Sequence, residues 1–497
     1  TLKPTTTTNG NITVAAGKTA TISAPIAFTN NAPTTITSGS GSTLNLGGGA
    51  SNSQYTFTGL GTVNMTGGAY QANVGKVNVA TFNQTSGTFS MQPNGLNTGY
   101  SIGENATRSV AYTMSGSSII NFNSQSTGTN SFLAIGRTTG NTAYSNTLNV
   151  TGAANLNVGT TAARSGELQI ANNADSNGTL NVTGGAATVG TGKTDNKIYF
   201  FKAGSGFGYT ANLTQSGGTV IANGIQFGGT SGIYDTTSTA NLTLSGGVLY
   251  VGAQGITRGS AADDLPVAIK LQGGTLGASQ NWSSSLDMQL GATAGGVTIR
   301  AQDAANTARN ITLTGNLSDD GDVSGTLIKV GSGTLTLQGN NSFTGGLTIK
   351  NGTVESKTTQ TTLGSGTVTM GGVGSSGATY ITGQNSSNPF VINAPDSGSV
   401  IIGANGVGSG FTLSGGVTLN GNLTLQTFDN PVSESNKATS ILTGGVTGTG
   451  NLLLNNLGLA SNTISLTTAA VNHTGTITLS GTAATGDTTI SAPIGSN

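Results

Sequence analysis

One short phrase recurs along the first half of the chain, and this repetition constrains the fold more than any other feature of the sequence. The phrase consists of an apolar residue, a polar residue, an apolar or polar residue, and then Thr or Ser followed by Gly. Copies begin at Val63, Phe82, Tyr112, Leu148, Leu180, Leu213 and Leu242. Such periodicity predicts one supersecondary unit that is stacked on itself many times.

The residues that follow each copy recur as well. After the copy at Leu180, a short strand ends at Val189, a loop follows, and an apolar run begins at Ile198. The unit therefore predicts three short strands separated by Gly corners, with a longer loop before the next unit, which is the layout of a single-stranded parallel β-helix. Stacking would bury like side chains over like, and Asn at repeated corners would form ladders of amide hydrogen bonds.

Another all-β arrangement is the alternative, because an antiparallel sandwich or an array of barrels also alternates short strands with turns. The near-constant repeat and the scarcity of two-residue hairpin signals favour the parallel β-helix. An α-helical fold is excluded, since Gly and β-branched residues interrupt every stretch that is long enough for a helix.

Composition excludes several classes of partner. Charged residues make up only 7% of the chain, and 17 basic residues balance 17 acidic ones. No two basic residues are adjacent, so neither a nucleic-acid-binding patch nor a polybasic membrane-binding cluster is expected. The absence of Cys rules out disulfides and thiolate metal sites. The sequence also contains no apolar run of about 18 residues, so no helix is expected to insert into a membrane. Because the chain begins at Thr1 without Met, we interpret it as a processed protein or a fragment.

The character of the chain changes near Gly259. Residues 1–258 are expected to form a β-helix with wide, loop-decorated coils of about 30 residues. Residues 259–497 are expected to continue as a tighter β-helix, because shorter Gly-punctuated strands replace the earlier unit.

Residues 329–354 carry the most specific motif, with the sequence KVGSGTLTLQGNNSFTGGLTIKNGTV. This segment closely resembles the autotransporter-associated β-strand repeat, with Lys, Gly-Thr-Leu, Asn, Phe and a final Gly-Thr at the matching positions. Weaker echoes lie at residues 38–48 and 444–454. The resemblance implies a right-handed β-helix of the autotransporter passenger type, secreted or displayed on the outer surface of a bacterium.

The hexapeptide TISAPI occurs twice, at residues 21–26 and 489–494. One interpretation is that each copy is an ordinary repeat within a longer solenoid. The other is that the two ends are equivalent coils, so that the end of one chain stacks on the start of the next and builds a filament. The candidate assembly residues are Thr21, Ile22, Pro25, Ile26, Thr489, Ile490, Pro493 and Ile494.

Residues that could support catalysis or metal binding are sparse. His473 is the single His and is expected at a corner or on the solvated wall. Asp319, Asp320 and Asp322 are weak candidates for a metal site, with a solvated turn as the alternative. Trp282 is expected to be packed at a coil edge rather than to serve as a platform for sugars. We therefore predict no catalytic residue, no cofactor and no enzymatic activity.

These features predict an extracellular or cell-surface structural β-solenoid that assembles head-to-tail into a fibre or surface layer. Low charge would favour such self-association, because neighbouring copies repel one another weakly. The alternative is an adhesin-type passenger domain that binds host or matrix glycans through long loops. The loops considered for this role are residues 191–196 and 231–239.

Overall fold

The computed structural model of the 497-residue chain describes most of the sequence and divides into two compact units, Thr1–Lys270 and Leu271–Asn497. The described residues are 12–495, apart from 24–25, 28–33, 49, 52–53, 73, 94–98, 105–107, 125–130, 138–143, 163, 165, 173–175, 205–206, 292–294, 357–361, 405–409, 428–437, 458–461 and 482–486. Within them the regular secondary structure consists of strands, without a helix. The boundary between the units falls within β23 (Val267–Leu271).

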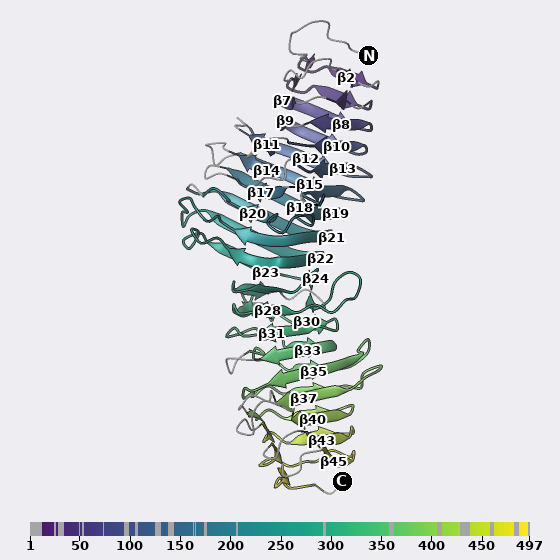
Figure 1. The fold of residues 1–497 in the computed structure, drawn as a ribbon, viewed down its shortest axis with the longest axis vertical. Coiled ribbons are helices and arrows are strands. Elements are labelled where there is room, and N and C mark those ends of the chain that lie inside the picture. The colour runs from purple at the N-terminus through teal and green to yellow at the C-terminus, as the bar shows by residue number, and fades with distance from the viewer. Residues whose placement is uncertain are drawn as a thin grey trace. The chain divides into compact units, whose positions relative to one another are not determined.

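The first unit is a right-handed parallel β-helix whose coils each contribute to three ladders of hydrogen-bonded strands (Figure 1). Ladder one contains β1 (Ile12–Val14), β4 (Thr34–Ser38), β11 (Gly99–Glu104), β14 (Phe132–Arg137), β17 (Glu167–Ile170) and β20 (Ile198–Phe200). Ladder two contains β2 (Thr19–Ile22), β5 (Thr43–Leu46), β12 (Val110–Met114), β15 (Ser145–Val150) and β18 (Asn177–Val182). Ladder three contains β3 (Ile26–Ala27), β6 (Ala50–Ser51), β8 (Ala69–Ala72), β10 (Thr88–Met91), β13 (Ile119–Phe122), β16 (Asn155–Val158) and β19 (Ala186–Val189). The longer strands β7 (Gln54–Met65), β9 (Val74–Gln84), β21 (Thr210–Phe227) and β22 (Thr239–Arg258) each pass through more than one ladder.

The repeated phrase of the sequence marks one column of the structure. Val63, Phe82, Tyr112, Leu148, Leu180, Leu213 and Leu242 pair in register down ladder two, each on the coil after the last. Their side chains point inward and are at most 1% exposed. The rings of Phe82 and Tyr112 stack with centroids 4.5 Å apart. The prediction of a parallel β-helix is thus confirmed, and identical residues stack over one another from Leu148 to Leu242.

The Gly residues of the phrase form the corner between ladders two and three. Gly185 and Gly218 occupy equivalent places on consecutive coils, with φ of 63° and 62°. A Cβ atom on Gly218 would lie 2.6 Å from the carbonyl oxygen of Gly185. Both the backbone conformation and the close approach of the coils therefore require Gly here.

Amide ladders are present, but in the first unit their position differs from the prediction. Asn45, Asn64 and Asn83 face outward in mid-strand, and each donates its side-chain amide to the preceding coil. The two Asn–Asn hydrogen bonds are 2.9 Å long. Parallel strands bring equivalent residues roughly 4.8 Å apart, which lets stacked amides bond anywhere along a strand. The expectation that such ladders sit at corners is therefore wrong for this unit.

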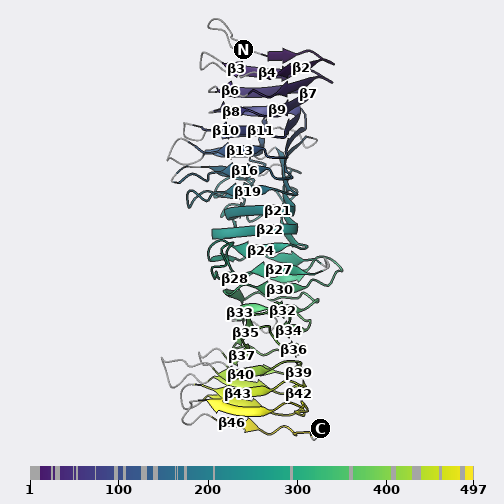
Figure 2. The same ribbon diagram turned by 90° about the vertical axis from the view of Figure 1, so that its right-hand side faces the viewer.

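The second unit also consists of parallel coils (Figure 2). One ladder contains β24 (Thr275–Ala278), β27 (Val297–Arg300), β30 (Leu327–Val330), β32 (Leu347–Ile349), β34 (Val368–Met370), β36 (Phe390–Ile392), β39 (Val417–Leu419) and β42 (Val446–Gly448). A second contains β25 (Trp282–Ser284), β28 (Ile311–Leu313), β31 (Thr334–Leu337), β33 (Asn351–Ser356), β35 (Gly377–Thr382), β37 (Val400–Ala404), β40 (Leu423–Thr427), β43 (Leu452–Asn456) and β45 (Ile477–Gly481). The others are β26 (Met288–Leu290) with β29 (Leu317–Asp319), and β38 (Phe411–Leu413) with β41 (Thr439–Leu442), β44 (Thr463–Leu466) and β46 (Asp487–Ile490).

Corners of the second unit use Asn in another way. The side-chain oxygen of Asn281 accepts a hydrogen bond of 2.8 Å from the backbone nitrogen of Asn310 on the next coil. The side-chain oxygen of Asn310 in turn accepts one of 3.1 Å from Thr334. These side-chain-to-backbone bonds satisfy amide groups that would otherwise have no partner where a strand begins.

Residues 329–354 form one coil and begin the next. Leu327 pairs with Leu347, and Leu335 pairs with Val354, so the segment stacks on itself. Lys329 occupies an inward position between Ile299 and Ile349 and is 0% exposed. Its Nζ donates hydrogen bonds of 2.7 Å to the carbonyl oxygens of Gly331 and Asn351, and burial lowers its pKa from the ordinary value to about 7. The sequence pattern gave no indication that this lysine lies in the core.

Candidate functional site

One face of the first unit departs from the usual alternation of buried and exposed residues. All four residues of β17 are buried, including Glu167 and Gln169, which point away from the core and are 6% and 2% exposed. Tyr199 on β20 pairs with Gln169 and is 9% exposed. Loops at residues 190–197 and 228–238 lie beside these strands, the first before β20 and the second after β21.

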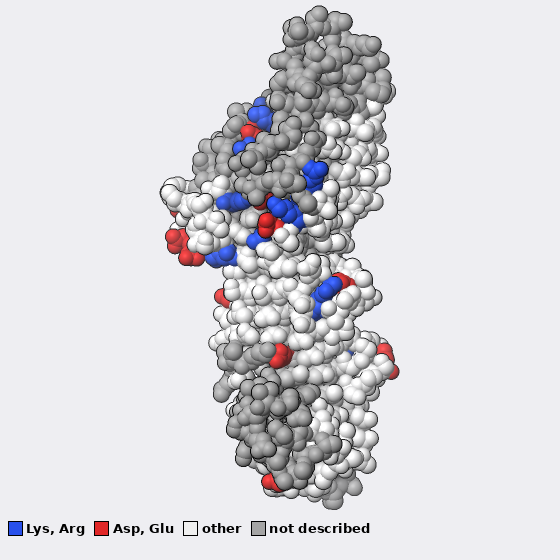
Figure 3. Space-filling model, in the orientation of Figure 1, with Lys and Arg blue, Asp and Glu red and all other residues white. Residues whose placement is uncertain are grey.

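Charged side chains are concentrated on this face, although only 7% of the residues of the chain are charged. Figure 3 shows the charged side chains of the first unit clustered beside a wide uncharged surface. Glu104 pairs in register with Arg137, and their side chains form an ion pair of 3.4 Å. On later coils the face carries Glu167, Lys197 and Lys202. A locally charged surface on an otherwise uncharged β-helix is typical of a site rather than of the scaffold.

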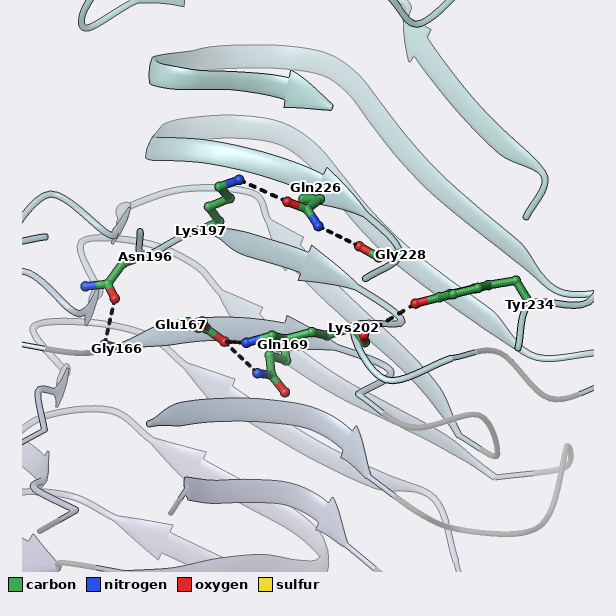
Figure 4. A network of polar contacts seen from close by, with 9 residues as sticks. All are labelled: Gly166, Glu167, Gln169, Asn196, Lys197, Lys202, Gln226, Gly228 and Tyr234. Atoms are coloured by element: carbon green, nitrogen blue, oxygen red, sulfur yellow. Dashed lines mark hydrogen bonds and ion pairs between the residues drawn. The ribbon is translucent and has the colours of Figure 1, made fainter. Parts of the chain in front are cut away.

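A network of polar contacts centres on Glu167 (Figure 4). Its Oε2 accepts hydrogen bonds from Lys202 Nζ at 2.5 Å and from Gln169 Nε2 at 2.8 Å. Lys202 Nζ also lies 4.7 Å from the centroid of the Tyr199 ring. The buried carboxylate is thus neutralised by an ammonium group that the aromatic ring helps to hold in place.

A second set of contacts fixes Lys197 on the same face (Figure 4). Lys197 Nζ donates a hydrogen bond of 2.9 Å to Gln226 Oε1, and Gln226 Nε2 donates one of 3.0 Å to the carbonyl oxygen of Gly228. Desolvation lowers the pKa of Lys197, although the carboxylates of Asp195 and Glu167 oppose this effect. Desolvation and the same two carboxylates raise the pKa of Tyr199 far above its ordinary value, so that its hydroxyl stays protonated.

Both loops beside this face are anchored by hydrogen bonds. Asn196 donates to the carbonyl oxygen of Arg164 at 2.9 Å and accepts from the backbone nitrogen of Gly166 at 3.1 Å. Asn223 donates to the carbonyl oxygen of Thr194 at 2.6 Å, which ties the same loop to the next coil. Tyr234 holds the other loop, because its hydroxyl donates to the carbonyl oxygen of Phe201 at 3.0 Å. The loops are therefore held in one arrangement, as a preorganised site requires.

A pocket of about 290 Å³ opens between the two loops. We call it the loop pocket; its lining residues are Asp195, Lys197, Tyr199, Lys202, Gln226, Gly229, Thr230, Ser231 and Gln254. Asp195 belongs to the predicted loop 191–196, and Ser231 belongs to the predicted loop 231–239. The structure therefore brings together at one pocket the two loops that the sequence suggested for ligand binding.

The chemistry of the loop pocket suits recognition of a polar ligand. The amides of Gln226 and Gln254 offer donors and acceptors, and Tyr199 offers a ring and a hydroxyl group. The Tyr199 hydroxyl forms no hydrogen bond with the described residues, so it is available to a ligand. Glu167 already has two partners and is not among the lining residues, so Asp195 is the carboxylate that lines the pocket. Glycosidases use a pair of carboxylates across the bond they cleave, and this lining does not provide one.

The acidic residues considered for metal binding lie in the second unit, and two of them accept hydrogen bonds. Asp319 Oδ1 accepts hydrogen bonds from the backbone nitrogens of Gly325 at 2.7 Å and Thr344 at 3.1 Å. Asp320 Oδ2 accepts one of 2.8 Å from Gln272 Nε2, and Asp322 is exposed. Across the described part of the chain, His, Asp and Glu residues form no group of three placed to hold a metal ion.

The repeated hexapeptides lie in separate units. Thr21 and Ile22 belong to β2 and pair with β5, whereas Thr489 and Ile490 belong to β46 and pair with β44. Ile494 forms a bridge with Val471 and is 64% exposed, and Pro493 is also exposed. Pro25 and the side chain of Ile26 lie outside the described residues. Self-association through these residues stays a prediction, which electron microscopy over a concentration series would test.

Two single residues have definite places. His473 is only 9% exposed, and both ring nitrogens are buried without a hydrogen-bond partner among the described residues, so it does not lie on a solvated wall. It lies between the bridge at Val471 and the bend that begins at Thr474, which fits the other expected position, a corner. Trp282 is 4% exposed and donates through Nε1 to the carbonyl oxygen of Gly277 at 3.3 Å. It is packed, as expected, and presents no platform.

Sequence reasoning missed the role of the charged residues in and beside the loop pocket. Lys193, Asp195, Lys197 and Lys202 fall within ten residues of a chain in which only 7% of residues are charged. This local concentration of charged residues is the sequence feature that could have indicated the site. Glu167 and Gln226 carry no such signal, because they reach the site from the preceding and following coils.

Among the described residues, the structure contains no helix with the length and apolar character needed to cross a membrane.

Comparison with known proteins agrees with this architecture. A family model described as the passenger-associated transport repeat matches residues 327–355. The chain is also 30% identical over 247 residues to the adhesin BmaC autotransporter of Brucella suis biovar 1 (strain 1330). That match covers 50% of this chain but only 6% of the length of the relative. No solved structure shows a significant match to the chain. The chain therefore carries a passenger-associated transport repeat and is similar over half of its length to an autotransporter adhesin.

Proposed function

We propose that this chain is a ligand-binding segment of an adhesin-type passenger that is displayed on, or secreted from, a bacterial surface. In this role the β-helix is a rigid support, and the loop pocket holds a polar group of a host or matrix glycan. The protein acts by binding and not by catalysis. The convergence of two anchored loops from consecutive coils on one polar pocket carries this proposal.

Similarity to an autotransporter adhesin supports the surface role. The low content of charged residues supports the surface role as well, because a protein surface without strong charge does not attract nucleic acid or anionic membranes. Against this background the loop pocket is a local concentration of charged, amide and aromatic side chains. Such convergence of polar groups in a concave site is the usual sign of ligand binding.

The test is binding of the purified chain to an array of immobilised neutral and acidic oligosaccharides. Thr230 is exposed and lines the loop pocket, so Thr230→Trp should fill it without changing a strand. Thr236 is exposed on the same loop but does not line the pocket, which makes Thr236→Trp the matched control.

We expect the unaltered chain and Thr236→Trp to bind the same oligosaccharides, and Thr230→Trp to lose them. Circular dichroism of both variants should match the unaltered chain. If no oligosaccharide binds, or if Thr230→Trp binds as well as its control, the proposed function is wrong.

A further inference from the structure

We propose that the loop pocket selects an acidic sugar, one that carries a single negative charge as a carboxylate or a sulfate ester. This inference rests on the proposed function and names the ligand class of the same site. It follows from the balance of charges around the pocket and from the placement of Lys197.

Two of the three lysines near the loop pocket have carboxylate partners. Lys193 Nζ lies 3.9 Å from Asp195 Oδ2, and Lys202 Nζ lies 2.5 Å from Glu167 Oε2. Lys197 lines the pocket and forms no ion pair among the described residues. The site therefore carries one uncompensated positive charge, and a ligand with one negative charge would neutralise it.

The position of Lys197 suits contact with an anion. An ammonium group has three hydrogens to donate, and Gln226 Oε1 accepts one of them. Gln226 is itself fixed, because it is 8% exposed and its amide is bonded to Gly228. Lys197 thus keeps two donors for the pocket while its head group is held in place. Desolvation disfavours its charged form, and a bound anion would reverse this effect.

The remaining lining matches the neutral part of a sugar. Tyr199 presents a hydroxyl that stays protonated, and Gln254 and Ser231 add polar groups that pair with sugar hydroxyls. The volume of about 290 Å³ lies just below the usual range for ligand pockets, roughly 300–1,000 Å³, which suits one sugar unit.

Selectivity for charge would act only at short range. The chain carries no net charge, so its overall field does not draw anions toward it. An acidic sugar would be preferred only when its anionic group lies at Lys197, and changing this one side chain should remove the preference.

The experiment compares lactose, sialyllactose and sulfated lactose by titration calorimetry against the full chain. Sialyllactose supplies a carboxylate and sulfated lactose a sulfate ester, while lactose is their neutral parent. The variants are Lys197→Gln, Lys197→Arg and the control Lys350→Gln. Lys350 lies in the second unit and is half-buried, so its variant removes the same charge away from the pocket.

We expect at least one acidic ligand to bind about tenfold or more tightly than lactose, since hydrogen bonds to charged groups contribute on that scale. Lys197→Gln should remove this difference by weakening the acidic ligands more than lactose, Lys197→Arg should retain part of it, and Lys350→Gln should leave it unchanged. The ligand that gains most identifies the acidic group as carboxylate or sulfate.

The inference is overturned if lactose binds as tightly as both acidic ligands, or if Lys197→Gln weakens all three equally. In either case the proposed function stands, because a sugar still binds. If none of the three ligands binds and the array is also negative, both the inference and the proposed function fail.

Discussion

Lys329 Nζ donates a hydrogen bond of 2.7 Å to the carbonyl oxygen of Asn351, and this bond joins two consecutive coils from within the core of the second unit. A second bond of the same length reaches the carbonyl oxygen of Gly331. Two carbonyl acceptors match the two hydrogens of a neutral amine, whereas an ammonium group has three. This arrangement explains how a lysine is tolerated in a column otherwise occupied by residues such as Ile299 and Ile349.

The stability of the second unit should depend on the protonation of Lys329. Its pKa is about 7 in the folded chain and about 10.4 in an unfolded chain. Between these values the unfolded state binds more protons, so the free energy of unfolding should rise with pH across this window. Below pH 7 the burial of the charged lysine lowers the free energy of unfolding by its full amount, roughly 5 kcal/mol at most, and above the unfolded pKa this loss is absent.

Lys329→Met should lack this rise. The free energy of unfolding of the variant, minus that of the unaltered chain, should therefore be larger at pH 6 than at pH 10. Trp282 is the only Trp and is buried in the second unit, so its fluorescence during urea unfolding reports on the relevant part of the chain. Lys350→Met is the control and should follow the unaltered chain at every pH. Parallel pH profiles for Lys329→Met and the unaltered chain would contradict the assignment.

The ion pair between Lys202 and Glu167 should stabilise the first unit. Glu167→Gln leaves Lys202 without a carboxylate, and we expect a loss of about 2 kcal/mol, reduced from the value for a fully buried pair because the Lys202 side chain is 25% exposed. The double variant Glu167→Gln with Lys202→Gln should lose less stability than the sum of the losses of the two single variants. Thermal melts of the unaltered chain, both single variants and the double variant make up this double-mutant cycle. Strictly additive losses would show that the two groups do not interact.

The ladder of Asn45, Asn64 and Asn83 should also contribute. Asn64→Ala removes two amide hydrogen bonds, each with a net contribution of about 1 kcal/mol, so a loss of about 2 kcal/mol is expected. Thr62 lies on the same strand, and its side chain has no such partner among the described residues, which makes Thr62→Ala the control. Equal melting temperatures for the two variants would mean that the ladder adds nothing to stability.

The corner Gly residues should differ in their tolerance of a methyl group. Gly218→Ala places Cβ against the carbonyl oxygen of Gly185 at a strained φ of 62°, and we expect a loss of about 3 kcal/mol. Gly41 has a φ of 64° but no atom within 4 Å of the added Cβ, so Gly41→Ala should lose only about 1 kcal/mol. Circular dichroism melts separate the two cases. Similar losses would show that backbone strain alone sets the requirement for Gly.

The register of the first unit could be predicted from the sequence because every coil repeats the same local pattern. The phrase that begins at Leu148 returns at Leu180 and Leu213, and these residues are direct neighbours in ladder two. Periodicity carries this information, since residues one period apart must meet when equal units stack in parallel.

The functional details could not be predicted in the same way. Lysine is almost never buried without a partner, so the inward position of Lys329 contradicts the usual expectation for its residue type. The loop pocket combines Tyr199, Gln226 and Gln254 from three consecutive coils, and no local pattern links them. The loops themselves could be identified as interruptions of the repeat, but the side chains they enclose depend on the three-dimensional stack.

Strand register in the first unit is independent of coil length. Asn64 and Asn45 are stacked although 19 residues separate them, and Asn157 and Asn121 are stacked across 36 residues. The longer coil has longer connections before and after the ladder-one strand β14, yet the strands stay in register, so changes of length in these connections need not displace any strand. Related chains can therefore acquire new ligand preferences by replacing loop segments, while the strand pairing of the β-helix stays the same.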